Sequence, residues 1–292
     1  HLFLIAMSRV NKKTTFNFFN YKWSKVPDWA EATESIYRSW YLKRYGYGTL
    51  RGLAGFLKDK ARIMEAGCGL ARDSKMFAEA NPNAKVVAVD QSRESLRVAQ
   101  EILRELPNCS VFRADLTDFE YPHKFDFISC DQVIHHIPDV GKTLKNLFGK
   151  LNPGGVINFS FCRKKNKLRD HVDDLIMDKA ASMSPDELWG FSVKVTEFGR
   201  ALHGLDIKNV RFENKKYEDI QRFVHNNLFR CWYNPSIDFR LSVSSNYDWF
   251  SNNPRFGARD VRKIIKDYIK NYKLLRFFED DATISVSLKK LL

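Results

Sequence analysis

Residues 62–72 read Arg-Ile-Met-Glu-Ala-Gly-Cys-Gly-Leu-Ala-Arg and form the most informative stretch of the chain. The apolar run that ends at Glu65 is typical of a short buried strand. Gly67 and Gly69 permit a tight turn and let a ligand approach the backbone, and a helix beginning near Asp73 would offer free N–H groups. The stretch therefore predicts a strand, a ligand-binding turn and a helix, in that order.

Further short apolar runs repeat the beginning of this pattern along the chain. Each reads as a buried strand, and they are expected at residues 85–90, 109–112, 125–130 and 156–161. Helical patterns lie between them at residues 74–80, 92–106 and 140–151, and Asn152-Pro153-Gly154-Gly155 stops the last. This alternation predicts an α/β protein whose parallel sheet carries helices on both faces.

The alternation stops after residue 161 and resumes near Ala258. The segment between is rich in Trp, Phe, Asn and charged residues, which predicts an inserted substrate cap. After Ala258 a helix and two strands, joined by a turn at residues 279–281, predict a closing antiparallel pair. The expected parts are an N-terminal helical arm, a core in two pieces and the cap, at residues 1–50, 51–162 with 254–292, and 163–253.

Composition restricts the class of protein. The formal net charge of +13 could attract nucleic acid, an anionic membrane surface or an acidic glycan, but Lys and Arg are spread along the whole chain, as on a solvated basic surface. The apolar stretches are far shorter than the roughly 20 residues of a membrane span. The five cysteines form no C-x-x-C pair, so neither a disulfide framework nor a metal site is expected. We expect a cytoplasmic protein with Met7 as its natural start.

Acidic residues follow three successive predicted strands. Glu65 would face a pyrophosphate unfavourably but suits a ligand with an ammonium group, and Asp90 could accept hydrogen bonds from both ribose hydroxyls. Asp115 could accept a hydrogen bond from an adenine amino group. Arg72 stands where a dinucleotide site needs a small residue. The pattern therefore favours an amino-acid-bearing nucleoside over a dinucleotide, which disfavours a NAD-binding oxidoreductase.

These segments, together with Asp131-Gln-Val-Ile-His-His-Ile-Pro138 and Leu151-Asn-Pro-Gly-Gly155, resemble the signature series of class I S-adenosylmethionine-dependent methyltransferases. The resemblance spans about half of the chain and implies a Rossmann-like sheet of seven strands, mostly parallel, with the last strand antiparallel. It implies S-adenosyl-L-methionine as cofactor and S-adenosyl-L-homocysteine as product. Ala71 replaces the family's frequent third glycine, a departure that should be tolerated.

The resemblance also implies a cofactor-binding set, namely Glu65, Gly67, Cys68, Gly69, Asp90, Gln91, Asp115, Leu116 and Asp131. Within the set, Asp90 would hold the ribose and Asp115 the adenine. Asp131 would lie beside the sulfonium, and the glycine turn with Glu65 would hold the methionine part of the cofactor.

His135 and His136 follow the fourth predicted strand and are candidates for a catalytic base. Methyl transfer to a hydroxyl requires removal of its proton, and a histidine titrates near neutral pH. The alternative is that one histidine packs or caps the next helix while the other faces solvent. Adjacent histidines at a strand end point in different directions, so a metal role is disfavoured.

Aromatic and acidic residues outside the core supply tentative substrate contacts. Tyr21, Trp23 and Trp249 would wall the sulfonium or the acceptor, since aromatic faces attract cations, although such residues more often form core. Tyr247 and Asp248 are secondary candidates for acceptor binding.

A second, looser resemblance is to a bacterial subgroup of methyltransferases in surface-glycan and secondary metabolism. It is carried by Phe19-Asn20-Tyr21-Lys22-Trp23, Asn246-Tyr247-Asp248-Trp249, Arg169-Asp170 and Asp173-Asp174. No catalytic role follows from it.

The prediction is methyl transfer to oxygen or nitrogen of a small-molecule or glycan acceptor, because a long inserted cap can close over a modest ligand. An RNA or other nucleic-acid methyltransferase would explain the charge, but the chain shows neither a separate RNA-binding module nor an Asn-Pro-Pro-Tyr-like motif after the fourth strand. A non-catalytic binding protein on the same fold is the remaining alternative.

Overall fold

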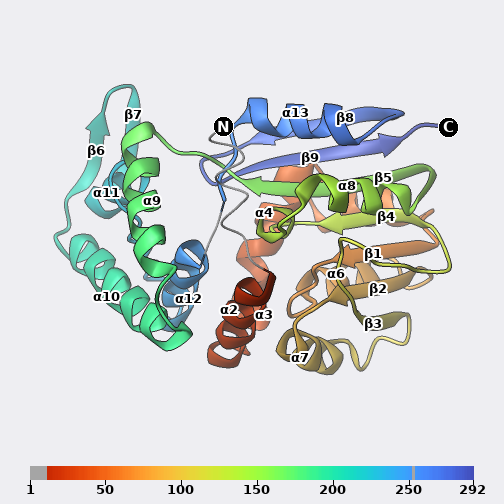
Figure 1. The fold of residues 1–292 in the computed structure, drawn as a ribbon, viewed down its shortest axis with the longest axis horizontal. Helices are drawn as coiled ribbons and strands as arrows, with labels where there is room; N and C mark the ends of the chain where they lie inside the picture. The colour runs from red at the N-terminus through yellow and green to blue at the C-terminus, as the bar shows by residue number, and fades with distance from the viewer. Residues whose placement is uncertain (1–11, 252–253) are drawn as a thin grey trace. The chain divides into compact units, whose positions relative to one another are not determined.

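The computed structural model describes residues 12–251 and 254–292. The chain divides into two compact units (Figure 1). Pro27–Arg163 and Pro254–Leu292 belong to unit 1, and Lys13–Val26 and Lys164–Asn253 to unit 2. The predicted N-terminal arm is therefore shared between the two units, and its first eleven residues lie outside the described part of the chain.

Unit 1 contains a seven-stranded sheet with the order β3-β2-β1-β4-β5-β9-β8 (Figure 1). Its strands are β1 (Arg62–Ala66), β2 (Lys85–Asp90), β3 (Cys109–Arg113), β4 (Phe125–Cys130), β5 (Leu151–Cys162), β8 (Tyr272–Glu279) and β9 (Thr283–Lys290). The first five are parallel to one another, and β9 runs antiparallel to both β5 and β8. The predicted mostly parallel sheet of seven strands is confirmed.

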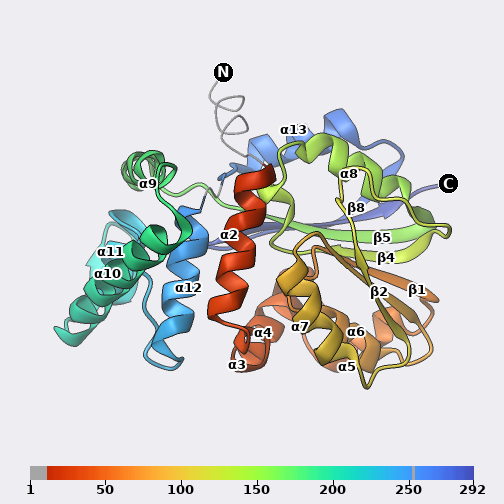
Figure 2. The same ribbon diagram turned by 60° about the horizontal axis from the view of Figure 1, so that its bottom comes forward.

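Helices cover both faces of this sheet, as predicted. Figure 2 shows α8 (Val140–Gly149) and α13 (Ala258–Tyr268) on one face, and α5 (Leu50–Leu57), α6 (Arg72–Ala80) and α7 (Arg93–Leu103) on the other. The side chains of successive strand residues point to opposite faces of the sheet. Met64 joins the core under α8 and α13, and Ile63 joins the core under α5 and α6.

Local sequence sets where two of these helices begin. The Ser92 hydroxyl accepts the backbone N–H of Ser95 at the start of α7, and the Asp139 carboxylate accepts the N–H of Lys142 at the start of α8. Such caps satisfy N–H groups that have no partner within the helix. The serine and the aspartate therefore fix the residues at which α7 and α8 begin.

The boundary between α8 and β5 differs from the prediction. The helix predicted to residue 151 ends at Gly149, and the strand predicted from residue 156 already begins at Leu151. Leu151 of β5 pairs with Phe125 of β4, and Val156 pairs with Phe127. Five positions along β5 thus correspond to two along β4, so residues 152–155 bulge out of the ladder. The Pro-Gly-Gly sequence that suggested a separate loop is a bulge within the strand.

Unit 1 also includes α3 (Trp29–Ala32), α4 (Glu34–Tyr45) and the short 3₁₀ helix η1 (Ile134–His136). Helix α4 lies against β8 and β9. Its Tyr41 and Tyr45 hydrogen bond to Ser129 and Asp131, where β4 ends. The aromatic-rich stretch of the arm thus reaches the carboxyl edge of the sheet.

Unit 2 is mainly helical. It contains α2 (Lys12–Lys25), α9 (Lys167–Ala180), α10 (Pro185–Gly204), α11 (Ile220–Asn227), α12 (Phe239–Phe250) and the hairpin of β6 (Lys208–Phe212) with β7 (Lys215–Asp219). Helix α10 begins with Pro185 at its first turn and a capping box between Ser184 and Glu187. Helices α10 and α12 pack against each other.

The chain leaves unit 1 and returns to it at neighbouring points. The backbone N–H of Phe256 donates to the carbonyl of Cys162 at 2.8 Å, and Arg163 forms a parallel bridge with Phe256. The residues before and after the long segment of unit 2 are therefore held side by side by the sheet of unit 1. Among the described residues, no helix has the length and apolar character to cross a membrane.

Candidate functional site

The turn after β1 is a tight loop in which three small residues have left-handed backbone conformations. Gly67, Gly69 and Ala71 all adopt positive φ angles, of 78°, 51° and 58°. The N–H of Gly67 donates to the carbonyl of Val89 at 2.7 Å, which holds the turn over the end of β2. A Cβ atom on Gly67 would lie 2.4 Å from Cγ1 of Val133. Position 67 therefore requires glycine for conformation and for space.

The carboxylate of Asp90 braces this turn from the end of β2. One oxygen accepts the N–H of Gly69 at 2.9 Å, and the other accepts the N–H of Ser92 at 2.8 Å. Burial raises the pKa of Asp90, although these two N–H groups and that of Gln91 act in the opposite direction. Each carboxylate oxygen can accept a further hydrogen bond, so the group remains able to bind a ligand hydroxyl.

Glu65, at the end of β1, is buried and binds the first turn of α6. One of its oxygens accepts both the N–H of Ser74, at 2.7 Å, and the hydroxyl of Ser74. Burial raises the pKa of Glu65 well above its usual value, and the nearby Asp73 raises it further, whereas Arg72 lowers it. A buried carboxylate in this position is suited to a cationic ligand group.

Arg72 contacts one acidic and two aromatic side chains of unit 1. Its Nε lies 2.7 Å from Oδ1 of Asp73, and its guanidinium carbon lies 4.8 Å from the ring centroid of Tyr37 and 5.4 Å from that of Trp29. Helices α3 and α4 thus cover the beginning of α6. The arginine is part of the packing beside the glycine turn.

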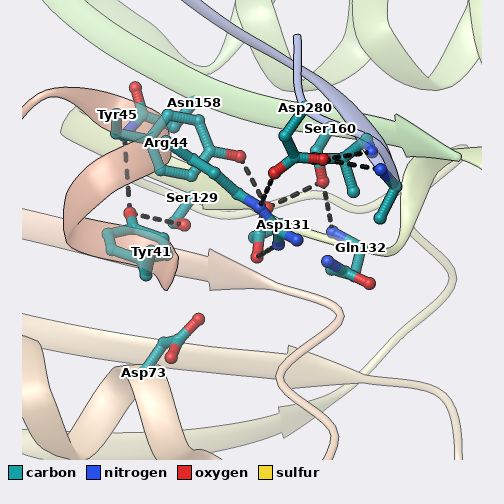
Figure 3. Close-up of polar contacts among 12 residues, drawn as sticks. Tyr41, Arg44, Tyr45, Asp73, Ser129, Asp131, Gln132, Asn158, Ser160 and Asp280 are labelled. Atoms are coloured by element: carbon teal, nitrogen blue, oxygen red, sulfur yellow. Dashed lines mark hydrogen bonds and ion pairs between the residues drawn. The ribbon is translucent and has the colours of Figure 1, made fainter. Parts of the chain in front are cut away.

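Asp131, directly after β4, is the centre of a buried polar network (Figure 3). Its Oδ1 accepts the hydroxyls of Tyr45 and Ser160, each at 2.7 Å. Its Oδ2 lies 4.0 Å from a guanidinium nitrogen of Arg44, whose Nε lies 3.2 Å from Oδ2 of Asp280. These contacts join α4, β4, β5 and the turn before β9, and they fix the orientation of Asp131.

The next residue, Gln132, adopts a positive φ of 60°, and its N–H donates to Oγ of Ser160 at 2.8 Å. The serine therefore binds both the side chain of Asp131 and the backbone that follows it. No motif in the sequence marks Ser160, Arg44, Tyr45 or Asp280 as a site residue. Tyr45 lies in an aromatic-rich stretch of the N-terminal arm, which is the one sequence feature that points to this network.

His135 and His136 are both buried, and their ring centroids lie 4.1 Å apart. Nε2 of His135 lies 3.4 Å from Sγ of Cys162, and its Nδ1 lies 3.5 Å from the carbonyl oxygen of Ser160. His135 is therefore held against β5. The catalytic role of either histidine stays a prediction.

The predicted adenine residues lie after β3. Oδ1 of Asp115 accepts the N–H of Thr117 at 2.9 Å, and Leu116 is buried in the core. Nε of Arg113 donates a hydrogen bond to the carbonyl oxygen of Gln91 at 3.1 Å. Because β1 to β4 are parallel neighbours, the whole predicted cofactor-binding set lies along one edge of the sheet.

The tentative substrate residues all lie in unit 2. Tyr247 is buried and stacks on Tyr21 with ring centroids 6.0 Å apart. Nζ of Lys22 lies 3.4 Å from Oδ2 of Asp248 and 4.4 Å from the ring centroid of Trp23. The buried Trp249 donates from Nε1 to Asp173 at 3.0 Å. The structure brings α2 and α12 together through these residues, and their role in acceptor binding stays a prediction.

Comparison with known proteins identifies the family to which the strand-and-helix part of unit 1 is similar. Residues 57–198 match the family model described as a methyltransferase domain. Trans-aconitate 2-methyltransferase from Azoarcus sp. is 35% identical over 101 residues, which cover 35% of this chain and 39% of that protein. The enzyme of the same name from Rhodopseudomonas palustris (strain BisA53) is 28% identical over 133 residues, covering 44% and 48%. The chain therefore spans less than half the length of these relatives.

A possible exported protein from Bordetella parapertussis superposes on the chain with a TM-score of 0.51 at 16% identity, covering 86% of this chain and 68% of that one. This likeness supports the fold alone. The resemblance inferred from the strand-end motifs is confirmed by the family match. Residues 57–198 are a methyltransferase domain of the class I, S-adenosylmethionine-dependent type.

Proposed function

We propose that this chain transfers a methyl group from S-adenosyl-L-methionine to an oxygen or nitrogen atom of a small-molecule acceptor. The observation that carries the proposal is the line of ligand-competent groups at one sheet edge of a methyltransferase domain, from the Gly67 turn through Glu65 and Asp90 to Asp131. S-adenosylmethionine, when bound, supplies a methyl group activated by its sulfonium. The chain's own groups orient it, and alignment accounts for much of the catalysis of such a displacement.

The donor set of the site fits this cofactor. Glu65 is a buried carboxylate whose charge an ammonium group would balance, and Asp90 keeps acceptor capacity for ribose hydroxyls. Asp131 is held rigidly by Tyr45 and Ser160, so its negative charge has a fixed position for a nearby cation. A site with these three carboxylates at strand ends is suited to a cationic nucleoside.

Glu65→Gln is expected to separate the two roles of this carboxylate. The amide oxygen can still accept both hydrogen bonds from Ser74, but it lacks the charge for an ammonium group. Cofactor affinity should fall by about 1.5–3 kcal/mol, roughly 10- to 150-fold, in isothermal titration calorimetry. Because the pKa of Glu65 is raised in the folded protein, the free energy of unfolding should increase at neutral pH.

The pH dependence of that increase has a definite sign. A carboxyl whose pKa is raised by folding lowers the free energy of unfolding of the protein as the pH rises from the unfolded pKa of the group, about 4.3, to its folded pKa. The gain from Glu65→Gln should therefore vanish below about pH 4, where both states are protonated. Glu79→Gln removes the same charge from an exposed position on α6 and is the control. Equal cofactor affinity in the two variants would contradict the role of Glu65.

We further propose that a histidine accepts the proton released by the acceptor. His136→Ala should lower kcat about 100-fold or more at nearly unchanged cofactor affinity, the range expected for loss of a general base. His135→Ala should also reduce turnover, but it removes the contacts with Cys162 and Ser160, so its stability must be measured alongside. His123→Ala, at an exposed position, is the control. Full activity in both test variants would place the base elsewhere.

The acceptor class is proposed from the relatives. Both relatives described above are named trans-aconitate 2-methyltransferases, so a small carboxylic acid is the first acceptor to try. A glycan remains the second choice, and the segment 163–253 is proposed to select the acceptor as a cap. The net charge of +13 keeps nucleic acid as a competing acceptor to be tested.

The experiment uses S-adenosylmethionine labelled in the methyl group and an extract separated into small-metabolite, glycan, protein and nucleic-acid pools. Label in the small-metabolite pool, absent with Glu65→Gln at low cofactor concentration, would support the proposal. Label in a nuclease-sensitive pool would replace the proposed acceptor, and cofactor binding without transfer to any pool would favour a non-catalytic binding protein.

A further inference from the structure

Arg169, on helix α9, has a fully buried side chain, with an exposed fraction of 0%. Its Nε donates to both oxygens of Asp173, each at 2.9 Å, one helical turn further along. Asp173 also accepts Nε1 of Trp249 at 3.0 Å. The guanidinium is therefore fixed at one end by a carboxylate that is itself held in place.

The other end of the same guanidinium is unsatisfied. Within residues 12–251 and 254–292, neither Nη1 nor Nη2 of Arg169 has a hydrogen-bond partner, and both nitrogens are buried. These two nitrogens carry four of the five N–H donors of an arginine. Burying charged donors without an acceptor is unfavourable, and in native proteins a ligand, an ion or an ordered water usually supplies the missing acceptor.

A second unsatisfied group lies on the neighbouring helix α11, which packs against α9. His225 is 5% exposed, and its Nδ1 has no hydrogen-bond partner in the described part of the chain. The ring packs edge-on against Trp232, with centroids 5.4 Å apart. Two facing helices thus each contribute one buried polar side chain with unused hydrogen-bonding capacity.

Positive charge surrounds His225. Burial lowers its pKa well below the usual value, and four cations, Arg230, Arg169, Lys165 and Arg222, lower it further. Arg230 donates to two neutral residues, Asn246 and Ser245. Asp173 is bound to Arg169, and Asp219 binds His203 and the N–H of Arg222. The charges that act on the imidazole are therefore predominantly positive.

We propose that Arg169, His225 and Arg230 together bind an oxyanion. This oxyanion would be a carboxylate or phosphate group carried by the methyl acceptor. The assignment to the acceptor rests on the proposed function, whereas anion binding itself does not. The forked Nη groups of arginine match two oxygens of such a group, and neutral His225 can donate from Nδ1 in the corresponding tautomer. Because neighbouring side chains cover the Nη atoms, a compact anion is favoured over a bulky one.

The test is calorimetric titration of the full chain with succinate and, separately, with inorganic phosphate, at constant ionic strength set by sodium chloride and without S-adenosylmethionine. Wild-type protein should bind at least one of the two saturably, and the preferred anion identifies the carboxylate or phosphate source. The double variant Arg169→Met with Asp173→Asn keeps an acceptor for Trp249 and leaves no unpaired carboxylate. It should weaken binding about tenfold or more. His225→Phe, which retains a ring against Trp232, should also weaken it.

Arg211→Met is the matched control, because it removes a positive charge from an exposed position of unit 2. Its affinity for the anion should equal that of the wild type, whereas the double variant, whose net charge is unchanged, should not. The inference is overturned if the wild type binds neither anion, or if Arg211→Met loses as much affinity as the double variant. Cofactor titration of the same samples reports on the proposed function separately, since its residues lie in unit 1.

Discussion

Gly67→Ala is expected to lower the free energy of unfolding by about 2–5 kcal/mol and to abolish measurable cofactor binding. The φ angle of 78° costs an alanine about 1–2 kcal/mol. The added methyl group would lie 2.4 Å from Cγ1 of Val133, and such overpacking costs about 1–3 kcal/mol more. Both effects displace the turn that follows Glu65. Denaturant titration and calorimetry with S-adenosylmethionine measure the two losses.

The control for this prediction is Gly48→Ala. Gly48 has a φ of 71°, but a Cβ there would meet no atom within 4 Å, so only the conformational cost applies. Gly67→Ala should lower the free energy of unfolding by less in a Val133→Ala background than in the wild type. The reason is that Val133→Ala removes the methyl groups with which the new Cβ collides. If Gly67→Ala and Gly48→Ala were equally stable, the close approach of Val133 would have no energetic importance.

Asp131→Ala is expected to lower the free energy of unfolding by about 3–5 kcal/mol, the range for removing one partner of a buried ion pair. The variant leaves the Tyr45 and Ser160 hydroxyls without their shared acceptor, and Arg44 with Asp280 as its remaining carboxylate. Cofactor affinity should fall as well, because the loop at Gln132 loses its support. Thermal and denaturant unfolding measure the first effect, and calorimetry the second.

Asp59→Ala, at an exposed position, should change stability by no more than about 0.5 kcal/mol and controls for loss of an acidic residue. Combining Asp131→Ala with Arg44→Met removes both charges of the pair. If the network is coupled, this double variant should lose less stability than the sum of the two single variants. Strict additivity would show that the 4.0 Å contact carries no coupling.

The sequence was sufficient for the sheet of unit 1 because each parallel strand contains a short apolar run, and because α7 and α8 begin at the recognisable capping residues Ser92 and Asp139. It did not reveal the bulge at residues 152–155, because Pro-Gly-Gly has the same local preference in a loop and in a bulge. The network around Asp131 was also missed. Tyr45, Ser160 and Asp280 are distant in sequence, and only the packing of α4 and β9 brings them together.

The helices of unit 2 were not predicted individually, for a physical reason. Polar residues that normally mark a solvent-facing side are buried between α10 and α12, where Asn246 donates to Thr196 at 2.9 Å and Ser192 is fully buried. Their presence interrupts the apolar periodicity by which an amphipathic helix is identified.

The hydrogen bond between Phe256 and Cys162 has an evolutionary consequence. A chain that departs from a sheet and rejoins it at adjacent residues closes a loop whose ends are already together, and the entropy of closing such a loop grows only slowly with its length. Insertions, deletions or wholesale exchange of the intervening residues therefore place little strain on β5 and α13. If residues 163–253 select the acceptor, as proposed above, changes confined to this one segment can alter the acceptor while the strand-end residues of unit 1 stay the same.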